Sequence, residues 1–418
     1  MTEWKEYKLK EVVSFIDYRG KTPNKKTFGV PLITAKIVKN GVIQEPTEFI
    51  SFEDYKGWMT RGFPEVGDVV MTTEAPLGEV AQIKDASFAL AQRIITMRGK
   101  EGLLHSGYLK YFLQSNIGQA RLKERETGTT VTGIKSSELK EVLVSAPDYK
   151  TQTSIAEILS SLDDKIELNN QINKDLEALA QALFKQWFID FDFPNENGEP
   201  YKSSGGEMAD SELGEIPKGW KIYSMSDLLE TVSKTYRLKN VDEVIFLNTR
   251  DIQDGKFLHE NISGPSTLPG QAKKSIVKGD ILYSEIRPAN RRFAYVHFDS
   301  EKYVVSTKLM VLRSKVTVNS LFQYFILTQQ DNIDYLQHLA ESRSGTFPQI
   351  TFSELSTIKL ALPDLKKINE FVDIALIPYF NCKFNSEMEN RELSNLRDVL
   401  LPKLISGELK VTNNSIEA

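Results

Sequence analysis

The densest group of side chains able to recognise a polar ligand lies in the segment Glu285–Phe293, which contains three arginines and an asparagine. Arginine can donate two hydrogen bonds to guanine, asparagine can pair with adenine, and both can hold phosphate. Strand-like residues on either side place the segment in a loop. The pattern indicates nucleic-acid recognition, with a merely solvated arginine loop as the alternative. The candidates here are Arg287, Asn290, Arg291 and Arg292.

Further basic or polar residues lie in predicted turns and loops elsewhere in the chain. They share an expected position beside extended segments, where a side chain can reach a ligand without disturbing a core. These additional candidates are Arg19, Lys21, Lys25, Lys36, Thr73, Arg237 and Arg250.

Motifs of enzymes are incomplete. Gly20-Lys21-Thr22 resembles the end of a phosphate-binding loop, but the glycine required five residues earlier is replaced by Phe15. Asp148 with Asp163-Asp164-Lys165 has the composition of a metal-dependent nuclease site, yet the latter three fall inside a predicted long helix, where a solvated helix face is the expected arrangement.

The four histidines, His105, His259, His297 and His338, lack zinc-ligand spacing. The nucleophile elbow and the signatures of an adenine methyltransferase are not found either. These observations favour a binding protein over an enzyme, with no catalytic, metal or cofactor site in this chain.

The chain contains an internal duplication. Trp4-Lys5 recurs as Trp220-Lys221, and Ser137-Glu138-Leu139 recurs 216 positions later as Ser353-Glu354-Leu355. Such a period is too long for a solenoid and indicates two homologous domains. Within each copy, short extended segments precede a helical one, as in 30–100 followed by 104–124. We therefore predict two α+β domains of about 150 residues each.

Each domain is followed by a segment with apolar residues at steps of three or four, Ile155–Trp187 and Ile368–Leu400. This spacing predicts two long helices that pack together as an antiparallel coiled coil, in which Pro378 causes a kink or a late start. Asn169 occupies a core position of the first helix, and the repeat places Asn385 at the equivalent point. Buried asparagines specify register, so the pair is a candidate register lock; the alternative is that both face solvent.

Composition limits the remaining possibilities. The chain has 418 residues, a net charge of −5 and one cysteine, Cys382, which excludes a disulfide framework and fits a reducing cytoplasm. We expect no membrane span. Residues 1–150 carry 22 basic and 19 acidic side chains, whereas residues 151–214 carry 4 and 13. The overall acidity argues at first against a nucleic-acid partner, but mildly basic blocks alternate with acidic ones along the chain.

The residues also carry a resemblance to a known family. The run Gln152–Phe191, the following segment through Trp220, the closing stretch Leu401–Leu409 and Arg19–Pro23 resemble the specificity subunits of Type I restriction–modification systems over the whole length. The chain departs from the family pattern at Asp148–Thr151 and at Pro378.

This resemblance implies two target recognition domains, each reading half of a bipartite double-stranded DNA site, with the helices as spacer. It implies a non-catalytic subunit that assembles with two methyltransferase subunits and with motor-nuclease subunits. S-adenosylmethionine, ATP and Mg²⁺ would then reside on those partners. The candidate partner contacts on the first helix are Phe184, Trp187 and Phe188, with packing inside the rod as the alternative.

The expected organisation is a target recognition domain at 1–150, a spacer helix at 151–192, a linker at 193–218, a second recognition domain at 219–366 and a second spacer helix at 367–410. The alternative function is a two-module scaffold that binds proteins and never touches DNA. Salt-dependent binding to duplex DNA would separate the two, because phosphate contacts release counterions.

Overall fold

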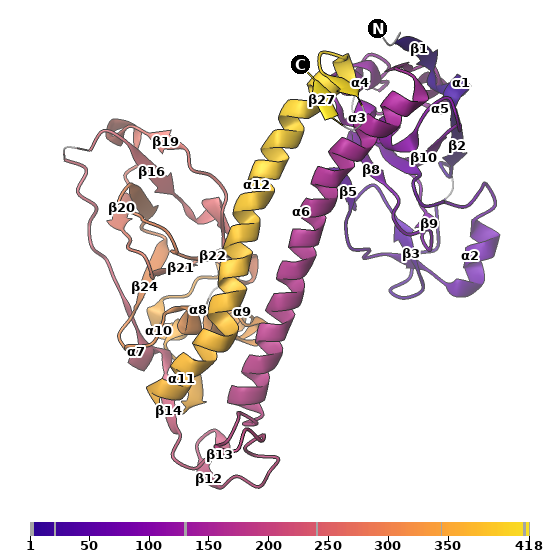
Figure 1. The fold of residues 1–418 in the computed structure, drawn as a ribbon. Helices are drawn as coiled ribbons and strands as arrows, with labels where there is room; N and C mark the ends of the chain where they lie inside the picture. Colours follow the sequence, from indigo (N-terminus) through magenta and orange to yellow (C-terminus); the bar gives the residue numbers. More distant parts are fainter. Residues whose placement is uncertain are drawn as a thin grey trace. The chain divides into compact units, whose positions relative to one another are not determined.

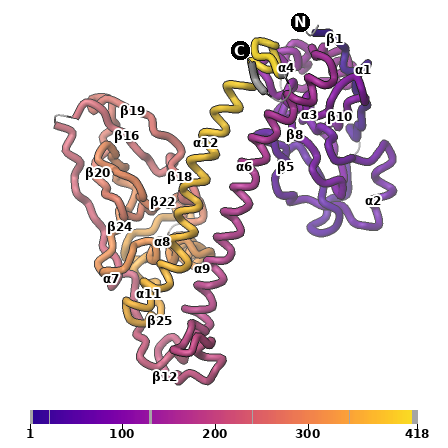
Figure 2. The backbone as a smooth tube through the Cα atoms, in the orientation of Figure 1, coloured from indigo at the N-terminus to yellow at the C-terminus, as the bar shows by residue number. Residues whose placement is uncertain are grey.

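A computed structural model describes residues 4–20, 22–128, 132–239, 241–343, 345–412 and 415–417. The chain divides into two compact units (Figure 1). Unit 1 comprises residues 1–171 and 386–418, and unit 2 comprises residues 172–385. Unit 1 is thus built from two separate stretches of sequence, and both marked chain ends lie in it (Figure 2).

Unit 1 contains an antiparallel sheet of four strands in the order β2-β10-β7-β8 and a smaller sheet in the order β6-β3-β9, where β3 and β9 are parallel. A ladder of β1 with β11 and hairpins of β4 with β5 and of β26 with β27 complete the described strands of this unit. The strands are β1 Lys5–Lys8, β2 Val13–Asp17, β3 Val30–Ile33, β4 Val38–Lys39, β5 Val42–Ile43, β6 Phe49–Ile50, β7 Val69–Thr73, β8 Leu77–Gln82, β9 Ala89–Leu90, β10 Ile94–Gly99, β11 Leu143–Ala146, β26 Lys410–Thr412 and β27 Ser415–Glu417.

The helical segment predicted at 104–124 is two helices, because Ser115 is extended and caps the second of them through Gly118 N–H. The first helix is completely buried from Gly107 to Leu113 and packs with the larger sheet in one apolar core. The helices that begin in unit 1 are α1 Leu9–Val12, α2 Phe52–Trp58, α3 Ser106–Gln114, α4 Asn116–Lys123, α5 Ser136–Lys140 and α6 Tyr149–Phe184.

Unit 2 repeats this plan with one additional strand, β20, in its smaller sheet. Its larger sheet has the order β15-β24-β21-β22, its smaller sheet β19-β16-β23-β20 has a parallel pair of β16 with β23, and β17 and β18 form the matching hairpin. Its strands are β14 Lys221–Ser224, β15 Leu229–Thr231, β16 Val244–Leu247, β17 Ile252–Gln253, β18 Lys256–Phe257, β19 Ile262–Ser263, β20 Ala272–Ser275, β21 Ile281–Ser284, β22 Phe293–Tyr295, β23 Tyr303–Ser306, β24 Leu309–Ser314 and β25 Lys359–Leu362.

The helices of unit 2 follow the same order as their counterparts. They are α7 Met225–Leu228, α8 Leu321–Leu327, α9 Gln330–Arg343, α10 Phe352–Leu355, α11 Leu365–Phe371 and α12 Ile377–Ser406, with the short 3-10 turns η2 Thr249–Asp251, η3 Pro265–Thr267 and η4 Pro288–Asn290. The predicted duplication is therefore confirmed at the level of topology and register, as when Gly99 pairs with Val13 and Ser314 with Leu229.

The segment predicted as a linker contains an ordered hairpin of β12 Met208–Ser211 and β13 Gly214–Pro217. Phe193 stacks on Tyr201 at 4.7 Å and on Trp220 at 5.0 Å between ring centroids. These aromatic contacts hold the segment against the core of unit 2.

The two long helices are the elements that cross from one unit to the other. α6 continues into the π-helical turn η1 Lys185–Ile189, and α11 continues through the π-helical turn η5 Val372–Leu376 into α12. The predicted interruption at Pro378 takes the form of this wider turn. A proline lacks an N–H and clashes with the carbonyl four residues earlier, and η5 supplies local geometry that keeps the chain helical.

Within each unit the helix segments pack antiparallel. In unit 1, Ile155 and Leu159 of α6 share a core with Leu404 and Ile405 of α12. In unit 2, Phe184 of α6 and Trp187 of η1 contact Phe371 of α11. Among the described helices, none is long and apolar enough to cross a membrane.

Candidate nucleic-acid interface

The arginine-rich segment of unit 2 forms a tight connection between β21 and β22. Ser284 N–H donates to the Arg292 carbonyl at 2.9 Å, so this hydrogen bond joins the two ends of the loop that contains η4. Arg287 and Arg291 flank η4 with φ values of 45° and 53°, a left-handed backbone that costs energy in non-glycine residues. Pro288 is buried and anchors the loop, which leaves the side chain of Arg287 exposed.

The arginines of this loop are in different situations. Arg291 forms an ion pair with Asp254 in the turn between β17 and β18, and its Nη1 donates to Gln330 Oε1 at 2.9 Å. The Arg287 side chain makes no ion pair with any residue that the structure describes. Arg291 therefore fixes the loop, whereas Arg287 is available to a ligand.

The two remaining candidates of this loop, Asn290 and Arg292, differ in burial. Asn290 is exposed, and its carbonyl accepts a hydrogen bond from Gln253 Nε2 at 3.0 Å, while Arg292 is half-buried. The structure thus brings this loop, the β17–β18 turn and the N-terminal turn of α9 together. The exposed polar residues of this loop are therefore Arg287 and Asn290.

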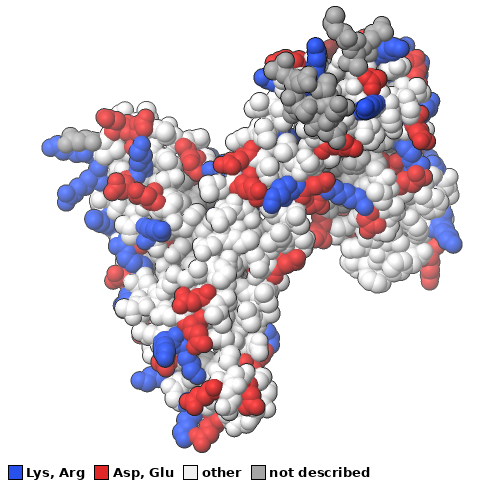
Figure 3. Space-filling view, viewed as in Figure 1, with Lys and Arg blue, Asp and Glu red and all other residues white. Residues whose placement is uncertain are grey.

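Arg250 and Arg237 lie on other loops of unit 2. Arg250 is 81% exposed and contacts Asp251 at 3.6 Å, and Arg237 is exposed on the segment that precedes β16. Figure 3 shows Lys and Arg side chains along the edge of unit 2 near β16, β19 and β20. No hydrogen bond or ion pair between described residues joins Arg237 to the η4 loop.

In unit 1 the structure brings Arg19 and Thr73 to one groove of about 460 Å³. Arg19 is largely committed to the protein, since it pairs with Asp17 at 2.6 Å and donates to the Ile134 carbonyl at 2.9 Å. Burial opposes ionisation of Asp17, but hydrogen bonds from Arg19 outweigh it and lower the pKa of this carboxyl. Thr73 is 3% exposed, so it can shape the groove but its side chain cannot reach a DNA base.

Lys25 and Lys36 converge on one carboxylate. Their Nζ atoms lie 2.8 Å and 3.3 Å from Glu48, and the hydrogen bond from Lys25 is the main cause of the lowered pKa of Glu48. Lys36 is 76% exposed and remains able to contact phosphate. Lys21 lies outside the described residues.

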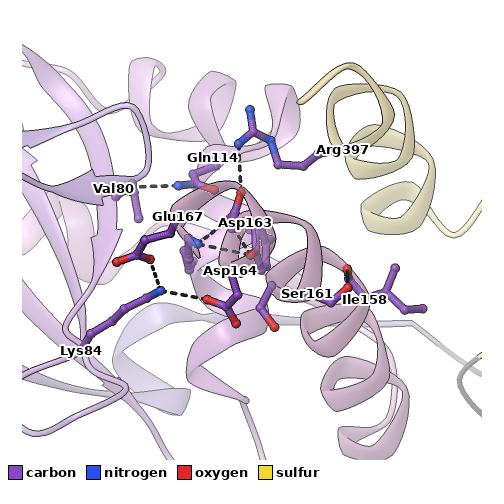
Figure 4. Close-up of polar contacts among 12 residues, drawn as sticks. Val80, Lys84, Gln114, Ile158, Ser161, Asp163, Asp164, Glu167 and Arg397 are labelled. Carbon is purple, nitrogen blue, oxygen red and sulfur yellow. Dashed lines mark hydrogen bonds and ion pairs between the residues drawn. The ribbon is translucent and has the colours of Figure 1, made fainter. Parts of the chain in front are cut away.

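The acidic pattern considered as a nuclease site has another role. Asp163 is mostly buried and contacts Lys110 and Tyr111 of α3 and Arg397 of α12, all within unit 1 (Figure 4). Asp164 and Glu167 instead bind Lys84, and Asp148 caps the start of α6 through Thr151 N–H. The described part of the chain contains no cluster of three metal-ligating side chains. The expectation of a solvated helix face is wrong for Asp163, because its partners come from distant segments.

The two candidate register residues differ in burial. Asn169 is 3% exposed, and its Nδ2 donates to Glu389 at 2.7 Å and to Asn390 at 2.9 Å, all within unit 1. Asn385 is exposed, and the buried residue in that turn is Ser386. The physical argument for a register role therefore applies to Asn169 and not to Asn385, because an exposed amide needs no specific protein partner.

Phe184, Trp187 and Phe188 belong to the core of unit 2. Their exposed fractions are 5%, 6% and 3%, and Phe188 lies 5.0 Å from Phe371 between ring centroids. The packing alternative is therefore correct, and these residues cannot form a partner-binding surface in the folded chain. The large apolar residues that the two long helices expose in unit 1 are Leu168, Met388, Leu396 and Val399.

Comparison with known proteins shows to which family this architecture belongs. A family model described as Type I restriction modification DNA specificity domain matches residues 1–178 and 217–381. The chain belongs to this family. It is accordingly a DNA specificity subunit of a Type I restriction–modification system and a non-catalytic one.

Two relatives and one solved structure define the range of similarity. The MjaIX specificity subunit of Methanocaldococcus jannaschii is 28% identical over 98% of this chain and 94% of its own length. The HindI specificity subunit of Haemophilus influenzae is 46% identical, but over 37% of this chain and 34% of its own length. A crystal structure of a Type I S subunit from M. genitalium covers 96% of both chains with a TM-score of 0.58 and 15% identity, which shows the shared fold.

Sequence reasoning missed two ion pairs of this specificity subunit, whose cations, Arg93 in unit 1 and Lys308 in unit 2, hold equivalent positions in the repeat. Glu74 pairs with Arg93 at 2.9 Å in unit 1, and Glu285 pairs with Lys308 at 3.4 Å in unit 2. It also missed Phe347, which is 61% exposed beside the segment that contacts Arg287. Aligning the two repeats residue by residue would have placed Arg93 opposite Lys308.

Proposed function

We propose that each unit of this specificity subunit reads one half of a bipartite DNA site through its α+β domain, at 1–150 in unit 1 and at 219–366 in unit 2. The observation that carries the proposal is the duplication of one strand topology with different loop chemistry. Unit 2 has an exposed arginine, Arg287, where the equivalent residue of unit 1 is Ala75, and both hold a left-handed backbone. A shared scaffold with unlike loops is suited to two unlike half-sites.

The long helices are the proposed spacer. α6 and α12 contribute segments to both units, so a change in their length would alter the distance between the two reading surfaces. The antiparallel contacts within each unit, such as Asp163 with Arg397, support a rod of defined register. A defined register in turn supports a fixed gap between the half-sites.

Two methyltransferase subunits and motor-nuclease subunits are the proposed protein partners. The methyltransferases would bind S-adenosylmethionine, and the motor-nucleases would bind ATP with Mg²⁺. This chain would recognise the DNA target. The exposed residues Met388, Leu396 and Val399 of α12 recur at helical spacing and form a better docking candidate than the buried aromatic residues of η1.

The test is co-expression of the full chain with a methyltransferase subunit of its own system, followed by mapping of methyladenine on genomic DNA. We expect a bipartite motif with a fixed gap that disappears when this chain is omitted. A stable complex without any such motif would contradict the proposal and leave the protein-binding scaffold. Binding to duplex DNA should also weaken steeply with salt, because phosphate contacts release counterions, whereas a scaffold would bind no DNA.

A further inference from the structure

The end of one central strand forms the same backbone junction in both units. In unit 1, Thr73 N–H donates to the Arg93 carbonyl at 2.9 Å and the Thr73 carbonyl accepts from Ile134 N–H at 2.9 Å. In unit 2, Glu285 N–H donates to the Lys308 carbonyl at 3.2 Å and the Glu285 carbonyl accepts from Ile350 N–H at 2.9 Å. The bridges of Glu74 with Gly133 and of Ile286 with Gln349 extend the match. The same junction of three chain segments is therefore present in both units.

Each junction carries one half-buried carboxylate paired with one exposed cation. The side chains of Arg93 and Glu74 are 58% and 40% exposed, and those of Lys308 and Glu285 are 48% and 23% exposed. Solvent-accessible pairs of this kind add little to stability. The cations Arg93 and Lys308 hold equivalent positions, whereas the carboxylates come from neighbouring positions, because Thr73 matches Glu285 and Glu74 matches Ile286. The folding of the scaffold therefore does not explain why a paired cation is present at this point of both junctions.

The backbone at the junction is held in an unfavourable conformation. Ala75 and Arg287, two residues after Thr73 and Glu285, have φ values of 49° and 45°, and Arg93 has a φ of 68°. Left-handed backbone is strained in non-glycine residues and concentrates at binding sites. In unit 1 the groove at this junction is lined by three cations, Arg19, Arg93 and Lys135, and by one carboxylate, Glu74. Because Arg19 is paired with Asp17 and Arg93 with Glu74, the remaining positive charge at the groove is that of Lys135, which suits contact with a DNA phosphate.

We propose that the Glu74–Arg93 pair of unit 1 and the Glu285–Lys308 pair of unit 2 are the specificity-determining residues, each reading a G·C base pair in the major groove. The inference rests on the proposed function. Guanine presents two acceptors to a cation, and cytosine presents an amino donor that a carboxylate accepts. In the absence of DNA the two side chains satisfy each other. On DNA each exchanges its partner for a base edge, so that neither charge is left unpaired.

The two pairs should differ in how strictly they discriminate a G·C base pair from other base pairs. Arg93 can donate two parallel hydrogen bonds to guanine, whereas Lys308 is a single flexible charge. We therefore expect the half-site read by unit 1 to be more strictly G·C at its position than the half-site read by unit 2. The neighbouring Arg287 would add a further contact in unit 2 only, since its counterpart Ala75 has no donor.

The experiment maps methyladenine after co-expression of the full chain with its methyltransferase subunit. For unit 1 the variants are Glu74→Gln and Arg93→Gly, because glycine tolerates the left-handed backbone at 93. For unit 2 they are Glu285→Gln and Lys308→Met. Each should lower methylation of the original motif about tenfold or more and relax one G·C position in one half-site only. The other half-site and the gap should be unchanged.

Matched controls lie outside both junctions. Glu141→Gln removes the half-buried partner of Lys8 and Lys10 in unit 1, and Lys359→Met removes an exposed partner of Glu212 in unit 2. Both should leave the motif intact. The melting temperature and co-purification with the methyltransferase confirm folding, and Arg93→Lys, which keeps the charge, should lose less discrimination than Arg93→Gly.

Three results would overturn the inference. They are a wild-type half-site without any required G·C pair, junction variants that leave the motif unchanged, and junction variants that weaken both half-sites equally. If the wild-type chain directs no bipartite motif at all, the proposed function fails and this inference fails with it. If the wild-type motif is bipartite and only the variants behave otherwise, the proposed function stands and only the reading pairs are wrong.

Discussion

Asp163 shows how a single side chain joins a recognition domain to the long helices inside unit 1. It accepts hydrogen bonds from Lys110 and Tyr111 of α3 and from Arg397 of α12 at 2.7 to 2.9 Å. Burial and the Asp163 charge raise the pKa of Tyr111, so its hydroxyl stays protonated and donates. Three elements that are far apart in sequence are thereby tied to one carboxylate.

The first prediction concerns the pH dependence of this carboxylate. Burial opposes its ionisation, but the Lys110 charge and the three hydrogen bonds outweigh burial and lower the pKa of Asp163. A lowered pKa means that the stabilisation is complete above the unfolded-state pKa near 4 and is lost as pH falls through the lower folded-state pKa. Asp163→Asn should therefore reduce the free energy of unfolding by about 3 kcal/mol at neutral pH, because it leaves Lys110 buried without its charge partner.

Urea unfolding of the full chain at several pH values measures this effect. The difference between wild type and Asp163→Asn should shrink below about pH 4. Asp164→Asn is the matched control, since Asp164 is 61% exposed and its pair with Lys84 is worth less than about 1 kcal/mol. An equal loss of stability in both variants would contradict the role assigned to Asp163.

At the scale of elements, the long helices bury one face and expose another. Within unit 1 the buried face includes Ile155 and Leu159, and the exposed residues of α12 include Met388 and Val399, at 60% and 57% exposure. Eleven positions separate Met388 from Val399, which places them on one side of the helix. Exposed apolar residues on one helix face are typical of a protein-binding surface.

The second prediction follows from that face. The double variant Met388→Glu and Val399→Asp should weaken capture of the methyltransferase subunit at least tenfold, since apolar contacts at an interface centre are replaced by charges. The melting temperature of the chain alone should change little, because both residues are exposed. Isothermal titration or co-purification measures capture. Asn395→Asp adds a charge on an exposed turn of the same helix and should have a much smaller effect; equal weakening by this control would refute the docking face.

The elements themselves were largely predictable from sequence, because apolar spacing reports local geometry. The long helices, the two α+β domains and the strands around Val69 and Ile94 lie where periodicity places them. The orientation of single side chains was not predictable. Phe184 and Phe188 carry the same apolar signal whether they face a partner or a core, and only the aromatic residues of α8 and α11 decide it. Likewise, the Arg19 guanidinium forms an ion pair with Asp17, a contact that composition alone does not reveal.

At the scale of the whole molecule, the duplication makes the two units alike in topology and unlike in their loops. Ion pairs with a buried aspartate recur with the scaffold, as Asp68 with Arg98 and Asp280 with Arg313, both at 2.7 Å. The loops that follow β7 and β21 differ, with Ala75 in one and Arg287 in the other. Retained internal contacts with varied exposed residues are consistent with two recognition surfaces on one architecture.

The third prediction concerns the spacer. Inserting seven residues after Gln171 in α6 and seven before Ser386 in α12 preserves the helical phase and lengthens the rod by about 10 Å. The gap between half-sites should then widen, by up to about three base pairs at 3.4 Å each, while both half-sites keep their sequences. Methyladenine mapping measures the gap. Substituting seven residues without insertion is the control, and an unchanged gap in the lengthened chain would remove the spacer role.

The discontinuous composition of unit 1 has a consequence for the order in which the protein can be made. A ribosome releases residues 4–171 long before residues 386–412, yet Ile155 and Leu159 are covered by Leu404 and Ile405. Unit 2 is one unbroken stretch and can complete its core first. During synthesis the nascent chain therefore carries an uncovered apolar face on α6 for more than 200 residues, so chaperone binding to that face should be strongest in ribosome-bound chains stalled before residue 386.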